Sequence, residues 1–189
     1  MTKERTLVII KPDAMQRSIV GKIISRFEDT GLKIVAMKML WPDDALVNAH
    51  YPLDMAWAEN VFKKTKAVHE AQKKPMEYKT AEHLGKAVQS WLIDFLKEWP
   101  VIAFVLEGPH AIELTRKIIG HTEPRQALPG TIRGDFISIE SYAIADSKKR
   151  VIRNLIHASD SKENAEREIA IWFKPAEIHT YSTHLERSL

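Results

Sequence analysis

The sequence predicts a protein of mixed α and β structure, with helices covering one face of a sheet. Two observations support this fold class. Residues 6–10 and 32–40 are β-branched and apolar runs of strand length, and each is followed by apolar residues at helical spacing. The 189 residues, of which 44% are hydrophobic and 28% charged, suffice for one domain spanning residues 1–189 with a substantial core.

The first strand, at residues 6–10, ends where Pro12 cannot donate to a sheet ladder. A helix over residues 20–29 follows, because Ile23 and Phe27 lie one turn apart, and Gly31 closes it. The second strand covers residues 32–40 with partial alternation of apolar residues. A short helix then leads to His50 and Tyr51.

Residues 53–98 are predicted to form a helical hairpin. Pro75 breaks the pattern, and Thr80 caps a second run with apolar residues at three- and four-residue spacing.

The rest of the chain predicts a third strand at 101–106, a helix at 110–119 stopped by Gly120, and a loop at 121–135. Residues 136–144 alternate as a strand does, and a charged turn follows at 146–150. A helix is expected over 162–170, and a surface tail with one helical turn over 174–189.

Composition limits the functional class. The net charge of +3 suits a small polyanion at least as well as nucleic acid, and the lack of cysteine excludes disulfides and thiolate metal sites. The charged N-terminus is unlike a signal peptide, and no apolar run has the length of a membrane span. We therefore expect a cytoplasmic protein with no membrane partner.

His157 is the first candidate for chemistry. An apolar stretch leads to it, and Ser159 and Asp160 follow it. A neutral imidazole can attack phosphorus and carry a phosphoryl group. A lone histidine, however, is more often a structural residue, and the other seven histidines are left with that interpretation.

Several residues could bind phosphate near such a histidine. Lys11 ends the first strand, and Arg133 lies between two glycines that let a ligand approach the backbone. Thr122 and Arg116 lie nearby in sequence, whereas Arg125 is interpreted as surface charge. Asn154 is three residues before His157, and Glu168, eleven residues after it, could hold its second ring nitrogen.

Other classes of site have little support. The histidines lack metal-site spacing such as HExxH, and no Walker-type loop is present. The lysine-rich stretch 63–74 is interpreted as a solvated helix face, so a nucleic-acid partner is not expected.

Together these motifs resemble those of nucleoside diphosphate kinases. The matching segments are Lys11-Pro12-Asp13, the glycine-threonine-isoleucine-arginine-glycine-aspartate run at 130–135, and the asparagine-x-x-histidine-x-serine-aspartate run at 154–160. Residues 31–38, His50-Tyr51 and residues 153–173 also match, in the family's order. The resemblance implies an α+β fold, a ferredoxin-like αβ sandwich with a four-stranded antiparallel sheet covered by helices.

The resemblance also implies the activity and the roles of residues. His157 would accept the γ-phosphoryl group of a nucleoside triphosphate such as ATP and pass it to a nucleoside diphosphate. Glu168 and Ser159 would support the histidine, and Lys11 would assist catalysis. Nucleotide contacts would come from Lys11, Tyr51, Arg116, Thr122, Arg133, Asn154, Val151 and Leu92. Mg²⁺ would arrive on the nucleotide phosphates without a direct protein ligand, and the chain would form a homo-oligomer: a hexamer, tetramer or dimer.

Two departures from the family pattern stand out. A helical insertion is expected at about 53–90, and a longer β-hairpin at about 141–151 with its tip near 146–149. The family's base-stacking phenylalanine aligns near Val88, which has no aromatic ring, so Trp91 or Phe62 are the candidates to replace it.

The sequence therefore favours a nucleoside diphosphate kinase that uses a phosphohistidine. Two alternatives remain: a regulatory protein that kept the fold but lost turnover, and a nucleic-acid-binding protein that uses residues 63–74.

Overall fold

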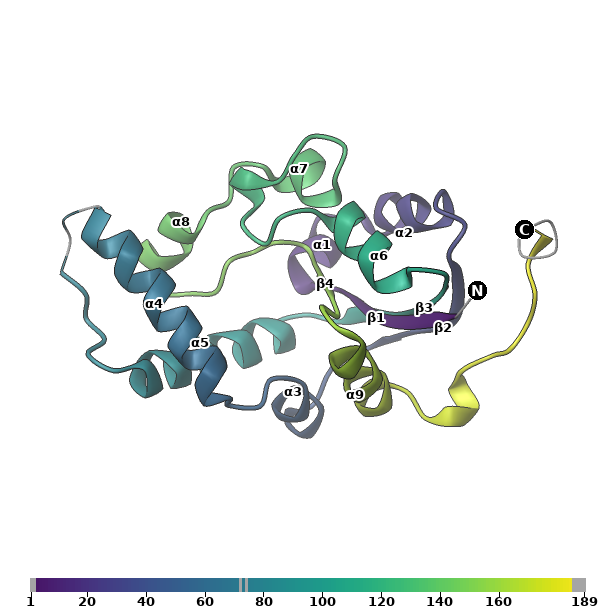
Figure 1. Cartoon of the computed structure of the whole chain (residues 1–189), viewed down its shortest axis with the longest axis horizontal. Coiled ribbons are helices and arrows are strands. Elements are labelled where there is room, and N and C mark those ends of the chain that lie inside the picture. Colours follow the sequence, from purple (N-terminus) through teal and green to yellow (C-terminus); the bar gives the residue numbers. More distant parts are fainter. Residues whose placement is uncertain (1–2, 72, 74, 185–189) are drawn as a thin grey trace.

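The computed structural model describes residues 3–71, 73 and 75–184. Its centre is an antiparallel sheet in the order β2-β3-β1-β4 (Figure 1). The strands are β1 (Glu4–Ile10), β2 (Lys33–Leu40), β3 (Val101–Gly108) and β4 (Ile156–Ala158). This α+β architecture confirms the predicted fold class.

The helices are α1 (Pro12–Gln16), α2 (Val20–Glu28), α3 (Asp44–His50), α4 (Met55–Ala71), α5 (Ala81–Lys97), α6 (Ala111–Ile119), α7 (Ile132–Ile137), α8 (Tyr142–Ser147) and α9 (Lys162–Trp172), with short 3₁₀ turns at Pro124–Gln126 and Pro175–Glu177. The predicted helices occur in the predicted order, and α1, α7 and α8 were not predicted. Among the described residues, no helix is both long and apolar enough to cross a membrane.

Helices cover both faces of the sheet, so the expectation of one covered face is wrong. Val8 and Ile10 of β1 pack with Phe27 of α2 and Ile119 of α6. On the other face, Leu7 and Ile9 pack with residues of α3, α5 and α9. Every residue of β1 from Thr6 to Ile10 is fully buried, which is typical of a strand covered on both sides.

The predicted helical hairpin is present as α4 and α5, which lie at one end of the molecule (Figure 1). Gly85 of α5 lies where an added Cβ would be 2.7 Å from the Cβ of Ala58, so glycine permits the close packing of α4 and α5. Within the lysine-rich stretch, Lys63, Lys64 and Lys66 are exposed on α4, as a solvated face requires, and Lys74 lies outside the described residues.

The predicted β-hairpin after residue 136 is wrong, because this segment forms the end of α7 and then α8. Thr131 and Ser141 accept hydrogen bonds from the backbone N–H groups of Gly134 and Ile144, so each starts a helix. The apolar residues that alternate in the sequence are divided between α7, the connecting segment and α8, and Phe136 and Ile137 of α7 pack against the core. Arg133 therefore lies on a helix rather than in a loop.

Candidate active site

His157 lies on the short edge strand β4, opposite Ile9 of β1. Its Nε2 is 2.8 Å from Oε2 of Glu168, and Ser159 Oγ donates to the same oxygen at 2.7 Å. A carboxylate can only accept, so Nε2 carries the proton and Nδ1 keeps its lone pair. Of the two ring nitrogens, Nδ1 is thus the one available for chemistry.

Helix α9 brings Glu168 to His157. Ser161 caps the helix by accepting from Asn164 N–H at 3.1 Å, and the buried Ala165, Ile169 and Trp172 hold it against the protein. Burial alone would raise the pKa of Glu168, but the hydrogen bonds and charge of His157 and its neighbours hold the pKa below its ordinary value. Glu168 therefore stays ionised beside the imidazole.

Lys11, Asn154 and Thr122 form one hydrogen-bonded chain. Lys11 Nζ donates to Asn154 Oδ1 at 2.9 Å, and Asn154 Nδ2 donates to the carbonyl of Thr122 at 2.8 Å. Burial and the nearby Arg133 lower the pKa of Lys11 to about 8, an effect that Asp13 partly offsets. Lys11 is thus still cationic at neutral pH, and an incoming anion would relieve its unfavourable burial.

Arg133 is buried and ties down the backbone before His157. Its guanidinium donates to the carbonyls of Asn154 at 3.1 Å, Gly120 at 2.9 Å and Ile156 at 2.7 Å. Burial and the charge of Arg116 lower the pKa of Arg133 to about 10, so it remains charged at neutral pH. A guanidinium has five N–H donors, so three backbone bonds leave capacity for an anion.

Asp13 is a site residue to which the sequence assigned no role. Its Oδ2 accepts from the backbone N–H of Leu155 at 2.9 Å, and the Lys11 N–H donates to the Leu155 carbonyl at 2.8 Å. Leu155 has a φ of 69°, which is costly for a side chain of this size. The segment 11–13 therefore holds a strained residue between Asn154 and His157.

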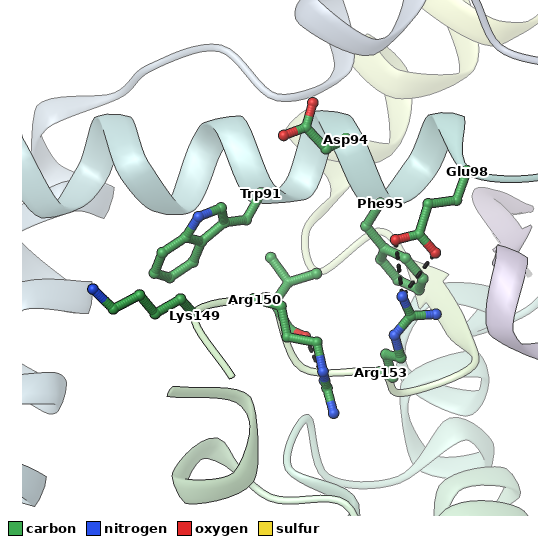
Figure 2. A pocket seen from close by; sticks show the side chains of 8 residues that line it. Trp91, Asp94, Phe95, Glu98, Lys149, Arg150 and Arg153 are labelled. Carbon is green, nitrogen blue, oxygen red and sulfur yellow. Dashed lines mark hydrogen bonds and ion pairs between the residues drawn. The ribbon is translucent and has the colours of Figure 1, made fainter. Parts of the chain in front are cut away.

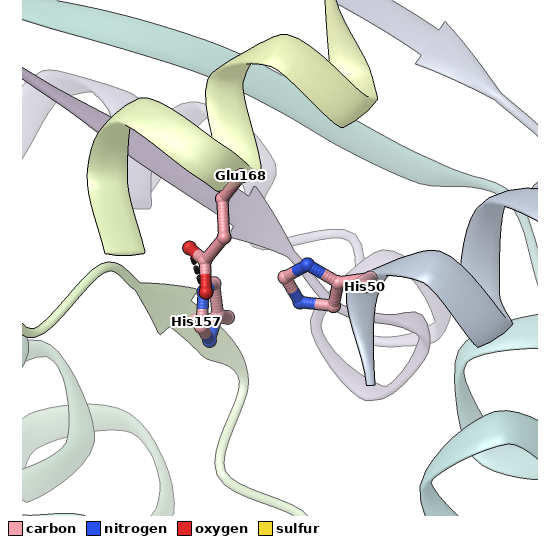
Figure 3. A group of neighbouring side chains, drawn as sticks. All are labelled: His50, His157 and Glu168. Carbon is pink, nitrogen blue, oxygen red and sulfur yellow. Dashed lines mark hydrogen bonds and ion pairs between the residues drawn. The ribbon is translucent and has the colours of Figure 1, made fainter. Parts of the chain in front are cut away.

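His50 is a second residue that the sequence missed. Its ring lies edge-on to that of His157, with centroids 4.8 Å apart, and Figure 3 shows it beside both His157 and Glu168. Trp172 Nε1 donates to His50 Nδ1 at 3.2 Å, so the His50 proton is on Nε2, which is buried and has no partner within the described chain. Burial and the neighbouring His157 lower the pKa of His50 well below its ordinary value. The sequence pair His50-Tyr51 matched the family's motif, but the contact between His50 and His157 is seen only in the fold.

A cavity of about 180 Å³ lies beside these groups, between α5 and residues 149–153 (Figure 2). Trp91 and Phe95 line it from α5, and Val151 lines it from the opposite segment. Lys11 Nζ lies 6.0 Å from the centroid of the Phe95 ring, so Phe95 connects the cavity to the lysine. A molecule with a flat ring and a charged tail could occupy both regions together.

The structure places the predicted nucleotide-binding residues in several different surroundings. Lys11, Thr122, Arg133 and Asn154 are joined by hydrogen bonds, and Arg116 reaches the carbonyl of Ala158 at 3.5 Å. Tyr51 packs against His50 with ring centroids 4.5 Å apart, and burial raises its pKa. Val151 lines the cavity, whereas Leu92, Val88 and Phe62 are not among its lining residues.

Comparison with known proteins identifies the family of this chain. The family model described as nucleoside diphosphate kinase matches residues 4–70 and 58–178. The nucleoside diphosphate kinase of Pyrococcus furiosus is 46% identical over 178 residues, which cover 94% of this chain and 88% of that protein. The chain belongs to the nucleoside diphosphate kinase family.

Solved structures of this family have the same fold. The NDP kinase of Pyrobaculum aerophilum superposes with a TM-score of 0.90 at 38% identity, covering 95% of this chain and 100% of that chain. A transition-state mimic of the nucleoside-diphosphate kinase from Borrelia burgdorferi, with bound vanadate and ADP, superposes with a TM-score of 0.80 at 40% identity, covering 98% of this chain and 96% of that chain.

The family's nucleotide chemistry raises the question of a metal. Among the described residues, the one group of three possible ligands that lie close together is His50, His157 and Glu168, within 4.8 Å of one another. Two imidazoles and one carboxylate do not match the oxygen set that Mg²⁺ requires. The donor set therefore does not fit a protein-bound Mg²⁺.

Proposed function

We propose that this chain transfers the γ-phosphoryl group of a nucleoside triphosphate to a nucleoside diphosphate through a phosphohistidine on His157. The observation that carries the proposal is the bond between His157 Nε2 and Glu168, because it leaves the Nδ1 lone pair free on a segment that Lys11 and Arg133 bind at Asn154 and Ile156. An unprotonated nitrogen next to fixed positive charge is what attack on a polyphosphate requires.

The reaction has two balanced halves. Nδ1 of His157 bonds to the γ-phosphorus while the bond from that phosphorus to the bridging oxygen breaks, and the oxygen keeps the electron pair and leaves with the diphosphate. Glu168 stabilises the imidazole as its positive charge develops. A second nucleoside diphosphate then attacks the same phosphorus and returns His157 to its neutral form.

Lys11, Arg116 and Arg133 supply charge to the polyphosphate, and Asn154 and Thr122 position it. Such groups act chiefly by placing the phosphates in line with Nδ1 and neutralising the leaving oxygen. Mg²⁺ is proposed to arrive on the phosphates and to add to that neutralisation.

The nucleoside is proposed to bind in the cavity of about 180 Å³, with its base between Trp91 and Val151. Trp91 replaces the phenylalanine that the resemblance would place near Val88. Of the two aromatic candidates, Trp91 lines the cavity and Phe62 does not. Phe95, which contacts both Lys11 and Arg153, lies at the junction of base and phosphates.

The chain is further proposed to be a cytoplasmic homo-oligomer. Edge strand β2 exposes Met37 and Met39, and the next residue after it, Trp41, is 61% exposed. Exposed apolar side chains on an edge strand favour contact with another copy.

A labelling experiment tests the function. The wild-type protein is incubated with γ-labelled ATP and then chased with a nucleoside diphosphate. We expect acid-labile label that the chase removes, and no label on His157→Ala. A folded wild type that never takes up label would contradict the proposal and would favour the regulatory alternative.

A further inference from the structure

We infer that two side-chain pairs joining the helical hairpin to the α8 segment, His69–Asp146 and Glu77–Lys149, are positioning residues that set the affinity for the nucleoside. This inference rests on the proposed function, because it takes the cavity between Trp91 and Val151 as the nucleoside site. It concerns the two segments by which this chain departs from its family's pattern.

The two segments are far apart in sequence and meet beside the cavity. His69 Nε2 lies 3.1 Å from Asp146 Oδ2, and Lys149 Nζ lies 3.0 Å from Glu77 Oε2. In Figure 1, α8 lies beside α4 at the end of the molecule away from the termini. Each pair therefore bridges from the hairpin to the segment that forms the opposite wall.

The Glu77–Lys149 bridge reaches both walls of the cavity, and the His69–Asp146 bridge joins the same two segments farther from it. Lys149 is itself a lining residue. Glu77 precedes Tyr78, whose ring contacts the Trp91 indole edge-on with centroids 6.4 Å apart. Loss of the ion pair between Glu77 and Lys149 would therefore release the Lys149 side chain on one wall. It would also loosen the segment that carries Tyr78, which packs against Trp91 on the other wall.

His69 makes a second contact that strengthens this assignment. Its Nδ1 lies 3.1 Å from the carbonyl oxygen of Pro75. This arrangement fixes the end of α4, the start of the connecting segment and α8 relative to one another.

The α8 wall is itself firmly anchored. Arg150 donates to both carboxylate oxygens of Glu140 at 3.0 Å and to the carbonyl of Val151 at 2.8 Å, and Glu140 is buried. A bidentate, largely buried pair is stronger than an exposed one. By contrast, the Lys149 and Glu77 side chains are 69% and 65% exposed. The wall carrying Val151 is thus rigid, and the hairpin carrying Trp91 is held to it by weaker, reversible contacts.

The test uses a double variant, Glu77→Gln with Asp146→Asn, and a matched control, Glu70→Gln with Glu82→Gln. The control also removes two carboxylates from exposed ion pairs, Glu70 with Lys66 on α4 and Glu82 with Lys86 on α5. Neither pair connects the hairpin to the α8 segment. Calorimetry measures the Kd of ADP and, separately, of inorganic tripolyphosphate, which has no base. Thermal unfolding checks that both variants are folded.

We expect the Kd of ADP to rise about threefold to tenfold in the test variant, as two exposed pairs of ordinary strength allow. The Kd of tripolyphosphate should be unchanged, as should both affinities in the control. A Tyr78→Ala variant should weaken ADP in the same way without a change of charge. An ADP affinity equal to that of the control, or an equal weakening of tripolyphosphate, would overturn the inference.

These outcomes are separate from failure of the proposed function. If wild-type protein binds ADP but never takes label from ATP, the function fails and the difference between ADP and tripolyphosphate still decides the inference.

Discussion

The phosphate end of the candidate site and the cavity assigned to the nucleoside are built from different parts of the molecule. His157, Lys11 and Arg133 lie on or next to strands and helices of the core. Their hydrogen-bond partners are buried: the carboxylate of Glu168, the side-chain amide of Asn154, and the carbonyls of Asn154 and Ile156. The cavity lies between α5 and the α8 segment, where exposed ion pairs make the cross-contacts.

This difference has a mechanistic consequence. Groups that position a reacting phosphorus must be held closely, because small displacements cost large factors in rate. A base can be held by stacking and weak polar contacts, which tolerate rearrangement. We therefore expect changes at the phosphate end to lower kcat and changes at the cavity to raise KM.

The largest effect is expected for Glu168→Gln. A carboxamide can donate to Nε2 and so favour the tautomer with the proton on Nδ1, and it cannot offset the positive charge on the ring. By analogy with other carboxylate–histidine pairs, we expect kcat to fall about 10²-fold or more with little change in KM. Glu166→Gln, on the exposed side of the same helix, is the control. Near-normal kcat in a folded Glu168→Gln protein would show that the carboxylate does not orient His157.

Most of the residues that the structure brings together around His157 were candidates from the sequence. Lys11-Pro12-Asp13 and the run from Asn154 to Asp160 are local motifs, and strands β1 and β4 join them directly. His50 and Asp13 had no assigned role because their significance depends on contacts with His157 and Leu155 that only the fold creates.

The cavity end was less predictable for physical reasons. The alternation of Phe136, Ile137 and Ile139 is compatible with a strand or with short helices, and the caps Thr131 and Ser141 decided between them. The choice between Trp91 and Phe62 depends on which face of the hairpin meets residues 149–153, and this is a tertiary contact. The strand predicted over 136–144 was wrong, whereas the choice between Trp91 and Phe62 was left open by the sequence.

Trp91→Ala should give the second largest effect, at the cavity. Stacking of one base on an aromatic side chain contributes about 1–3 kcal/mol, so the KM for nucleoside diphosphates should rise about 5- to 150-fold. The value of kcat at saturation should change little, and Trp91→Phe should recover most of the affinity. A fall in kcat without a rise in KM would break the proposed separation of the two ends.

The pH dependence of kcat/KM tests the phosphate end again, with a smaller effect. The pKa of Lys11 is lowered to about 8, so the free enzyme loses this cation as the pH rises through 8, well before an ordinary lysine would. The terminal phosphate, with a pKa near 6, is already ionised there. We expect kcat/KM to fall by up to about tenfold per pH unit above 8. In Lys11→Arg, a weaker enzyme, this fall should be absent, and a persistent fall would assign it to another group.

The smallest effect is expected at the position where the resemblance places an aromatic residue. Val88 lies on α5 and is partly buried, but it is not among the residues that line the cavity, so Val88→Phe should change the KM less than about twofold. The decisive measurement is made in the Trp91→Ala background. If the base stacks where the cavity lies, Val88→Phe leaves that variant impaired, since a ring one turn earlier on the helix cannot occupy the place of the indole. If instead Val88→Phe restores the KM, the base follows the family's usual path, and the insertions have left the nucleoside site where it was.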